Sequence, residues 1–309
     1  MMLTGECLPL EAFAEDCIIR NLTPETIRRY RSSLLQFQTF LQQNKLNVAS
    51  LNRDVLRLFL QHLRGHGVKP KTVENDFTAI SAFCDYLVYE DIAGSNPVLP
   101  FRKRYLKQYK DDFRSTKRLL SVEEMSRFVN SILDPRDCAI AVLLAKTGIR
   151  RGELLTLDVT DINWEFLSIT LKPAKKRSNR VVFFDDECAI VLRRWLRTRE
   201  ALGSRSEALF VSYESLGRLS RNGVWSAIVK YARRLGFHDS ESSKLEDHFG
   251  PHCFRHWFTT WLRRNGMPRE YVQELRGDHR REAIDIYDHI DSEDLRKKYL
   301  ACIPKLGLW

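Results

Sequence analysis

The 309-residue sequence lacks any apolar run near the length that a membrane-spanning helix requires. Its N-terminal stretch, MMLTGECLPLEAFAEDC, lacks the basic flank followed by an apolar segment that marks a secretory signal. The seven cysteines lie singly, without the close pairs typical of structural zinc sites or disulfide scaffolds. Internal repeats and low-complexity segments are also missing. We therefore expect a cytoplasmic protein with reduced thiols, and exclude a membrane protein and a secreted one.

Positive charge is what the chain has in excess. Lysine and arginine number 50 against 40 aspartates and glutamates, which gives a formal net charge of +10 and an isoelectric point of about 9.3. Such an excess causes self-repulsion, and a polyanionic partner is the simplest reason to keep it. A merely soluble basic protein would have the same balance. The length suits two domains of ordinary size, so we expect a two-domain protein that binds nucleic acid.

Helical periodicity runs through the first third of the chain. In NLTPETIRRYRSSLLQFQTFLQQN, Thr23 is placed to cap a helix, and apolar residues then recur every three or four positions. A second helix follows a cap at Ser50 or Asn52, and KPKTVENDFTAISAFCDYLVYE repeats the pattern. With a short helix near residues 9–20, this predicts a compact all-helical bundle of about four helices over residues 1–96.

A basic segment, residues 97–118, breaks this pattern with two prolines. Eight lysines and arginines stand here against two aspartates, with aromatic residues interleaved. We interpret the segment as an interdomain linker that can follow a phosphate backbone. A solvated hinge is the alternative.

The remaining residues, 119–309, have a mixed pattern. Ser121 and Glu124 form a capping box at a helix start. FLSITLKPAKKRSNRVVFFDD alternates apolar and polar residues on both sides of a basic turn, as a β-hairpin does, and helical patterns resume beyond it. The sequence therefore predicts a mainly α protein: an N-terminal helical bundle and a C-terminal α+β domain with a small antiparallel sheet.

Four local motifs follow one another in this second domain: TGIRRGELL, the basic hairpin turn, PHCFRHWFTT and LRGDHRREAIDIYDH. A single H-x-x-R pair is a weak signal, whereas the ordered set is specific. In this order the motifs resemble the tyrosine recombinases of the phage integrase family, and the resemblance covers nearly the whole chain. The last motif is also similar to the form found in some archaeal members. The resemblance implies a SAM-like core-binding domain at residues 1–96 and a catalytic domain with a C-terminal tail at residues 119–309.

The same resemblance implies a site-specific DNA recombinase that cleaves and rejoins strands through a 3′-phosphotyrosyl intermediate, without ATP, a metal or another cofactor. Arg150 and Arg255 would donate paired hydrogen bonds to the scissile phosphate, where charge develops during attack. Tyr287 would be the nucleophile. Lys175 would protonate the departing 5′ oxygen, and His252 would help manage the tyrosine proton.

Two of these positions stay open. Lys175 is placed by counting along the hairpin turn, so its neighbour Lys176 is a second candidate for the general acid. The family usually has a histidine or tryptophan nine residues before the nucleophile, where this chain has Asp278 followed by His279. Either the loop is shifted so that His279 fills the catalytic position, or Asp278 replaces the usual residue.

Neighbouring residues complete the expected site. Glu153, one turn after Arg150, would orient that guanidinium group. His256 would make a structural hydrogen bond on an apolar helix face, and Cys253 would act as a small buried hydrophobe. Each candidate also has an ordinary explanation when taken alone, such as a surface charge or an aromatic anchor. Their joint order favours catalysis.

The expected partner is double-stranded DNA, clamped between the two domains, and the resemblance implies four protomers assembled on two DNA sites in the nucleoid. The final stretch, SEDLRKKYLACIPKLGLW, is an amphipathic helix followed by an apolar tail, which either docks on a neighbouring protomer or caps its own domain. A topoisomerase with the same nucleophile and a non-catalytic DNA-binding protein are the rival functions. The sequence leaves open the DNA target and the choice between an integrase and a dimer resolvase.

Overall fold

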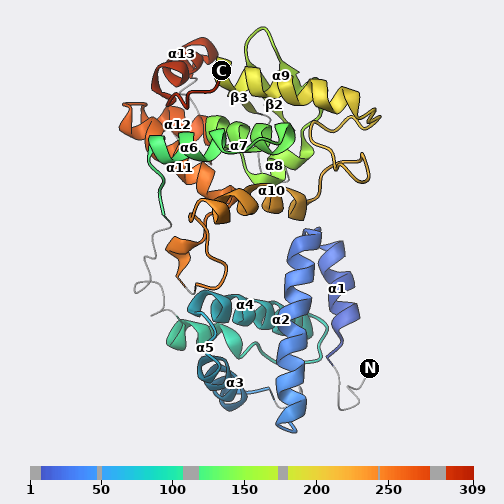
Figure 1. Ribbon diagram of the computed structural model, residues 1–309. Coiled ribbons are helices and arrows are strands. Elements are labelled where there is room, and N and C mark those ends of the chain that lie inside the picture. The colour runs from blue at the N-terminus through green and yellow to red at the C-terminus, as the bar shows by residue number, and fades with distance from the viewer. Residues whose placement is uncertain (1–7, 47–50, 107–117, 173–179, 243, 279–289) are drawn as a thin grey trace. The chain divides into compact units, whose positions relative to one another are not determined.

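The computed structural model describes residues 8–46, 51–106, 118–172, 180–242, 244–278 and 290–309. Contacts between Cα atoms divide the chain into two compact units, Met1–Arg114 and Ser115–Trp309. Helices dominate both units, and the small sheet belongs to the second one (Figure 1). None of the helices in the described ranges is long and apolar enough to cross a lipid bilayer.

The described part of the first unit is a bundle of helices around one apolar core. Its helices are α1 (Leu10–Ile19), α2 (Pro24–Gln43), α3 (Arg53–Gly65), α4 (Pro70–Tyr89) and α5 (Val98–Tyr105). The Thr23 side chain accepts a hydrogen bond from the backbone N–H of Thr26, which caps α2 as predicted. Asn52, one of the two predicted caps, accepts from the N–H groups of Asp54 and Val55 at the start of α3.

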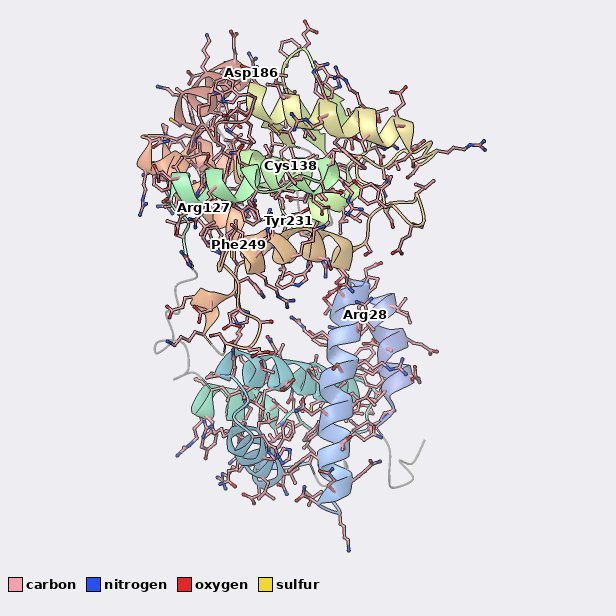
Figure 2. The ribbon with its side chains drawn as sticks, viewed as in Figure 1. Arg28, Arg127, Cys138, Asp186, Tyr231 and Phe249 are labelled. Carbon is pink, nitrogen blue, oxygen red and sulfur yellow. The ribbon has the colours of Figure 1, made fainter. Side chains whose placement is uncertain are left out.

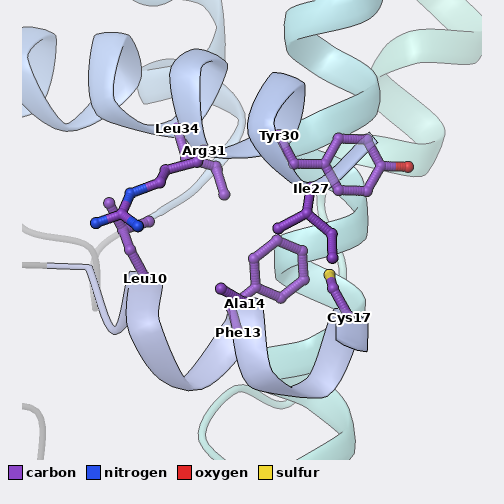
Figure 3. A pocket seen from close by; sticks show the side chains of 8 residues that line it. All are labelled: Leu10, Phe13, Ala14, Cys17, Ile27, Tyr30, Arg31 and Leu34. Atoms are coloured by element: carbon purple, nitrogen blue, oxygen red, sulfur yellow. The ribbon is translucent and has the colours of Figure 1, made fainter. Parts of the chain in front are cut away.

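Apolar side chains of α1 and α2 face one another across a small crevice (Figure 3). The residues that line it are Leu10, Phe13, Ala14, Cys17, Ile27, Tyr30, Arg31 and Leu34. Apolar residues recur at spacings of three and four along both helices and face the crevice, which explains why the helical periodicity of this region could be read from the sequence. The predicted all-helical bundle is confirmed.

Helix α5 differs from the expectation of a linker over residues 97–118. Residues Val98–Tyr105 are helical, and Phe101 is buried in the core of the first unit. Its ring stacks on Phe77 with 5.3 Å between centroids and 5° between planes. The aromatic side chains recur here at helical spacing, so they serve packing within the unit. Residues 107–117 of the expected linker lie outside the described part of the chain.

The second unit contains more helices and a three-stranded sheet. Its helices are α6 (Val122–Asn130), α7 (Pro135–Thr147), α8 (Arg151–Thr156), α9 (Asp186–Ala201), α10 (Arg221–Arg234), α11 (Pro251–Arg264), α12 (Arg269–Arg276) and α13 (Ser292–Cys302). Helix α7 is central, since every residue from Asp137 to Thr147 is buried. Cys138 on α7, Tyr231 on α10 and Phe249 are all buried in the core around it (Figure 2). The predicted capping box of Ser121 and Glu124 opens α6.

The sheet has the antiparallel order β1 (Ile162–Asn163), β2 (Ser168–Leu171) and β3 (Arg180–Phe183). Leu171 pairs with Arg180 and Ile169 with Val182, which confirms the predicted hairpin. The predicted fold class, a mainly helical chain with a small antiparallel sheet in its C-terminal domain, is also confirmed. The basic turn, residues 173–179, lies outside the described residues.

The C-terminal tail caps its own unit, one of the two arrangements expected from the sequence. Leu306 and Leu308 are buried in the same core as α7. The Glu187 carboxylate on α9 accepts hydrogen bonds from the backbone N–H groups of Leu306, Gly307 and Leu308. Three backbone N–H groups and two leucine side chains of the tail are therefore held within its own unit, whereas Trp309 is exposed.

Candidate active site

Two guanidinium groups from distant parts of the sequence converge in the second unit. Arg150 stands immediately before α8, and Arg255 lies in the second turn of α11. The carbonyl oxygen of Arg276, at the end of α12, accepts from Nη1 of Arg150 at 3.2 Å and from Nη2 of Arg255 at 2.8 Å. Nη1 of Arg255 also donates to the carbonyl of Gly148 at 2.9 Å. The predicted convergence of the two arginines is therefore present.

Gly148 explains the glycine of the first motif. It ends α7 with φ +60°, in the left-handed region that favours glycine. A Cβ at this position would lie 2.3 Å from a ring carbon of Phe258. The sharp exit from α7 and the close approach of α11 both require glycine, and together they bring Arg150 towards Arg255.

Glu153 holds Arg150 from the first turn of α8, as the sequence predicts. Its carboxylate accepts from Nη1 of Arg150 at 3.2 Å and from the backbone N–H of Arg150 at 2.7 Å. Arg180 donates two further hydrogen bonds to the same carboxylate, at 3.0 and 2.9 Å. Burial alone would raise the pKa of Glu153, but the hydrogen bonds and charges of the two arginines lower this pKa to about 2. Glu153 therefore carries its negative charge throughout the neutral range.

Arg180 is a site residue to which the sequence analysis assigns no role. It begins β3, is 8% exposed, and donates from Nε to the carbonyl of Leu275 at 3.0 Å. It shares the inward face of the strand with Val182, where the alternation calls for an apolar residue. An arginine at a strand position where the alternation predicts a buried apolar side chain was the signal that could have identified it.

The turn after α12 is shaped by Gly277. Its φ is +58°, and a Cβ here would lie 2.8 Å from both Cδ and Nη1 of Arg180. The backbone can pass over the Arg180 side chain only because this residue has no side chain of its own. Gly277 thus brings the carbonyl of Arg276 and the side chain of Asp278 to the two converging arginines.

Asp278 lies in the site. Its Oδ1 accepts from Nη2 of Arg150 at 3.2 Å and from Nη2 of Arg255 at 3.1 Å. Its Oδ2 lies 2.8 Å from Nε of Arg276. Of the two residues left open for this position, Asp278 therefore contacts both arginines, whereas His279 lies outside the described residues.

The site concentrates positive charge in a partly buried place. The side chain of Arg255 is 5% exposed, and that of Arg150 is 27% exposed. Burial and the nearby charges of Arg150 and Arg276 lower the pKa of Arg255 to about 9. The group still carries its charge at neutral pH, so an anion in front of the pair is electrostatically favoured.

His252 lies one turn before Arg255, on the exposed side of α11. Its ring packs edge-on against that of His256, with 4.8 Å between centroids and 87° between planes. The expectation that His256 lies on an apolar face was wrong. Phe254 and Trp257 occupy the inward stripe of the helix, and the two histidines therefore share the opposite side. Cys253 is buried as predicted.

The predicted nucleophile and both candidates for the general acid fall in segments that are not described. Tyr287 belongs to residues 279–289, and Lys175 and Lys176 belong to residues 173–179. Within the described ranges, no group of three or more histidines, cysteines, aspartates or glutamates is arranged to hold a metal ion. What the structure provides is thus a converging arginine pair that suits a phosphate group.

Residues 118–294, more than half of the chain, match the phage integrase family. The chain belongs to the phage integrase family. Residues 10–91 match the N-terminal SAM-like domain of phage integrases, so the nature of the first domain is confirmed as well. Membership in this family confirms the predicted class of activity, which is site-specific recombination of DNA by a tyrosine recombinase.

Similar proteins match most of the chain. Tyrosine recombinase XerC of Treponema denticola is 26% identical over 299 residues, covering 93% of this chain and 95% of the relative. Tyrosine recombinase XerD of Staphylococcus epidermidis is 27% identical over 293 residues, covering 93% of this chain and 95% of the relative.

Among solved structures, the Tn1549 transposon integrase in complex with circular intermediate DNA has a TM-score of 0.67 at 19% identity, covering 94% of this chain and 98% of that one. A lambda integrase dimer bound to a COC′ core site has a TM-score of 0.66 at 15% identity, covering 92% of this chain and 97% of that one. At these identities the likeness establishes the fold.

Proposed function

We propose that Arg150 and Arg255 hold the scissile phosphate of a DNA duplex while Tyr287 attacks its phosphorus. The observation that supports this most directly is that the two guanidinium groups converge on shared acceptor oxygens, at a carbonyl and at a carboxylate. Guanidinium N–H groups donate to the oxygens of a phosphate and stabilise the charge that develops on them during attack. The buried side chain of Arg255 strengthens this effect, because the surroundings screen its charge poorly.

The proposed reaction conserves the phosphoester bond energy. The phenolic oxygen of Tyr287 forms a bond to phosphorus as the bond to the 5′ oxygen breaks, and that oxygen leaves with a proton from Lys175 or Lys176. His252, one turn before Arg255, would take up the tyrosine proton. Reversal of these steps with a different 5′-hydroxyl joins a new strand without ATP. His279 stays a candidate for a further contact with the phosphate.

The proposal extends to the partners of the protein. The similar integrases are described as bound to DNA, one as a dimer on a core site, and the positive charge of this chain suits the same ligand. We infer that the protein binds duplex DNA in the cytoplasm, within the nucleoid, and that four copies assemble on two sites for strand exchange. Integration, excision and resolution all follow from the same chemistry.

Covalent trapping tests this proposal. The full-length protein is incubated with a pool of random-sequence duplexes that carry nicks, from which a short 5′-hydroxyl fragment can dissociate after cleavage. We expect a protein–DNA adduct that survives denaturation and is absent with Tyr287→Phe. Sequencing the trapped DNA identifies the site. An equal yield of adduct from Tyr287→Phe, or none from the native protein, would overturn the assignment and favour a DNA-binding protein without catalysis.

A strand-exchange assay follows with two differently marked duplexes that carry the recovered site. Recombinant duplexes are expected. Relaxation of a supercoiled plasmid without exchange of markers would instead indicate a topoisomerase.

The general acid is found by changing the leaving group. A sulfur in place of the bridging 5′ oxygen leaves without a proton, so it bypasses the need for an acid. Lys175→Ala and Lys176→Ala are compared on both substrates. Loss of the general acid should slow cleavage of the normal phosphate at least about a hundredfold and leave cleavage of the sulfur substrate at the native rate. The variant that shows both results identifies the acid.

A further inference from the structure

Asp278 stands where the proposed function requires a phosphate. One atom, Oδ1, accepts hydrogen bonds from Nη2 of Arg150 at 3.2 Å and from Nη2 of Arg255 at 3.1 Å. A single oxygen shared by two guanidinium groups is the arrangement expected of a non-bridging phosphate oxygen. The contact of one Asp278 oxygen with two guanidinium groups therefore has a defined geometry, which the general attraction of an acidic residue to a basic surface lacks.

The remaining terminal nitrogens of the pair are engaged elsewhere. Nη1 of Arg150 donates to Glu153 and to the carbonyl of Arg276, and Nη1 of Arg255 donates to the carbonyl of Gly148. These bonds fix both guanidinium groups from behind. Both Nη2 groups donate to Oδ1 of Asp278, and Nη2 of Arg255 donates in addition to the carbonyl of Arg276. The carboxylate of Asp278 thus occupies the place where the two Nη2 groups meet.

Two anions cannot share this position without strong repulsion, because a carboxylate and a phosphate oxygen would compete for the same N–H groups. The carboxylate already has a second partner that could retain it. Oδ2 of Asp278 lies 2.8 Å from Nε of Arg276, outside the pair. A rotation of the side chain towards Arg276 would vacate the shared position and keep the carboxylate paired.

We propose that Asp278 is an internal anion that occupies the phosphate position of the Arg150–Arg255 pair in the absence of DNA and is displaced by the scissile phosphate. This inference rests on the proposed function for the identity of the incoming phosphate. The internal anion compensates the buried charge of Arg255 while the site is empty, which a buried charge requires. It also makes every small anion compete with a tethered carboxylate, so the site is selective for a phosphate that is delivered by bound DNA.

The alternative is that Asp278 positions the two arginines and stays in place during catalysis. The two roles predict opposite effects of removing the side chain. A displaced anion weakens phosphate binding, so its removal strengthens binding. A positioning carboxylate assists binding, so its removal weakens binding.

Inorganic phosphate is the first probe, because it needs no knowledge of the DNA site. Its binding to the full-length protein is measured by the rise of the thermal unfolding temperature with phosphate concentration. We expect Asp278→Asn and Asp278→Ala to bind phosphate about tenfold more tightly than the native protein, the size of one close like-charge interaction. Glu270→Gln is the matched control, since it removes one exposed negative charge from α12, the helix that ends just before Asp278. The double variant Asp278→Asn with Arg150→Gln should lose this gain in phosphate affinity. That loss would show that the phosphate binds at the arginine pair.

The second probe is the duplex recovered by covalent trapping, bound to proteins that also carry Tyr287→Phe. Asp278→Asn should again bind more tightly than Glu270→Gln. Replacing the scissile phosphate by an uncharged methylphosphonate should reduce that gain to the level of Glu270→Gln, because the competing charge is gone from the DNA.

The outcomes separate the two claims. Equal affinities of Asp278→Asn, Asp278→Ala and Glu270→Gln for both probes would overturn the displacement of Asp278. Weaker binding by Asp278→Ala, with Asp278→Asn close to the native protein, would overturn it in favour of a positioning role. Failure of the native protein to form any tyrosine adduct, with the gain in phosphate binding intact, would refute the proposed catalysis and leave the internal anion standing.

Discussion

At the scale of single residues, the arginine pair depends on a carboxylate that never touches a substrate in the proposed reaction. Glu153 ties Arg150, the start of α8 and the strand residue Arg180 together. Its pKa is about 2, far below the ordinary value of a glutamate. A group with a lowered pKa in the folded state stabilises that state above its ordinary pKa, and the stabilisation is lost as the pH falls through the folded pKa.

Glu153→Gln is expected to remove this stabilisation. At neutral pH the variant should lose about 3 kcal/mol of unfolding free energy, the equivalent of the pKa shift of Glu153. The difference from the native protein should shrink as the pH falls from about 4.5 towards 2, where the native side chain becomes protonated. Urea unfolding followed by tryptophan fluorescence measures it in the second unit, because all six tryptophans lie there. Glu270→Gln should show no such difference, and a pH-independent loss would contradict the argument.

At the scale of elements, the ends of helices position the site more than their middles do. Gly148 caps the C-terminus of α7 and Gly277 that of α12, and both glycines have positive φ. One carbonyl at each end then accepts a hydrogen bond from Arg255. The position of Arg255 is therefore sensitive to the two turns that follow these helices.

Gly277→Ala should affect both stability and cleavage. The positive φ alone costs an alanine about 1 kcal/mol, and the clash with Arg180 adds a displacement of that side chain. We expect a loss of about 3 kcal/mol in urea unfolding and a cleavage rate at least tenfold lower. Gly236→Ala is the matched control, with φ +70° and no atom within 4 Å of the added carbon. It should lose only about 1 kcal/mol and cleave normally. Equal effects of the two variants would rule out the contact with Arg180 as the cause.

Helix caps, the hairpin and the ordered motifs could be predicted because each has a local cause. Asn52, the Ser121 capping box and the alternation around the basic turn all depend on residues close in sequence. The convergence of Arg150 and Arg255 was predicted from the resemblance alone, because no local pattern relates residues so far apart.

Other features depend on tertiary contacts that a single sequence does not display. Helix α5 is held by the core of its unit, where Phe101 packs on Phe77. The role of Arg180 arises from its bonds to Glu153 and Leu275, and that of Asp278 from its contact with two arginines. For Arg180 and Asp278, the spatial neighbours, rather than the local pattern, decide between a surface charge and a site residue.

At the scale of the whole molecule, a buried ionic network joins the C-terminal tail to the centre of the second unit. Nζ of Lys146, on α7, donates to Asp185 at 2.8 Å, to Glu187 at 2.5 Å and to the carbonyl of Pro304 at 2.7 Å. Lys146 is 0% exposed. Glu187 also binds backbone N–H groups of the tail from Leu306 onwards.

Lys146→Met should therefore destabilise the second unit by about 3–5 kcal/mol, because it removes the buried cation that pairs with Glu187 and leaves Asp185 paired only with the exposed Lys305. Deletion of residues 305–309 should also lower the free energy of unfolding, because it removes contacts of the same network. The loss in the double variant should be smaller than the sum of the two separate losses. Urea unfolding followed by tryptophan fluorescence checks both. Lys298→Met, at an exposed position on α13, should be neutral within about 0.5 kcal/mol. Strict additivity would show that the tail is held independently of Lys146.

We expect the net charge of +10 to act on DNA binding rather than on folding, so salt should affect the two very differently. Phosphate contacts release counterions, and a chain that makes about six to ten of them loses roughly 10³ to 10⁵ in affinity between 50 and 200 mM salt. The ion pairs that hold the site, such as Glu153 with Arg180, are buried and therefore poorly screened. Over the same range we expect the unfolding temperature of the second unit to change by only a few degrees. Fluorescence anisotropy of a labelled random-sequence duplex with Tyr287→Phe gives the affinity without covalent trapping. A DNA affinity that is nearly independent of salt would mean that the excess of lysine and arginine does not contact the phosphate backbone.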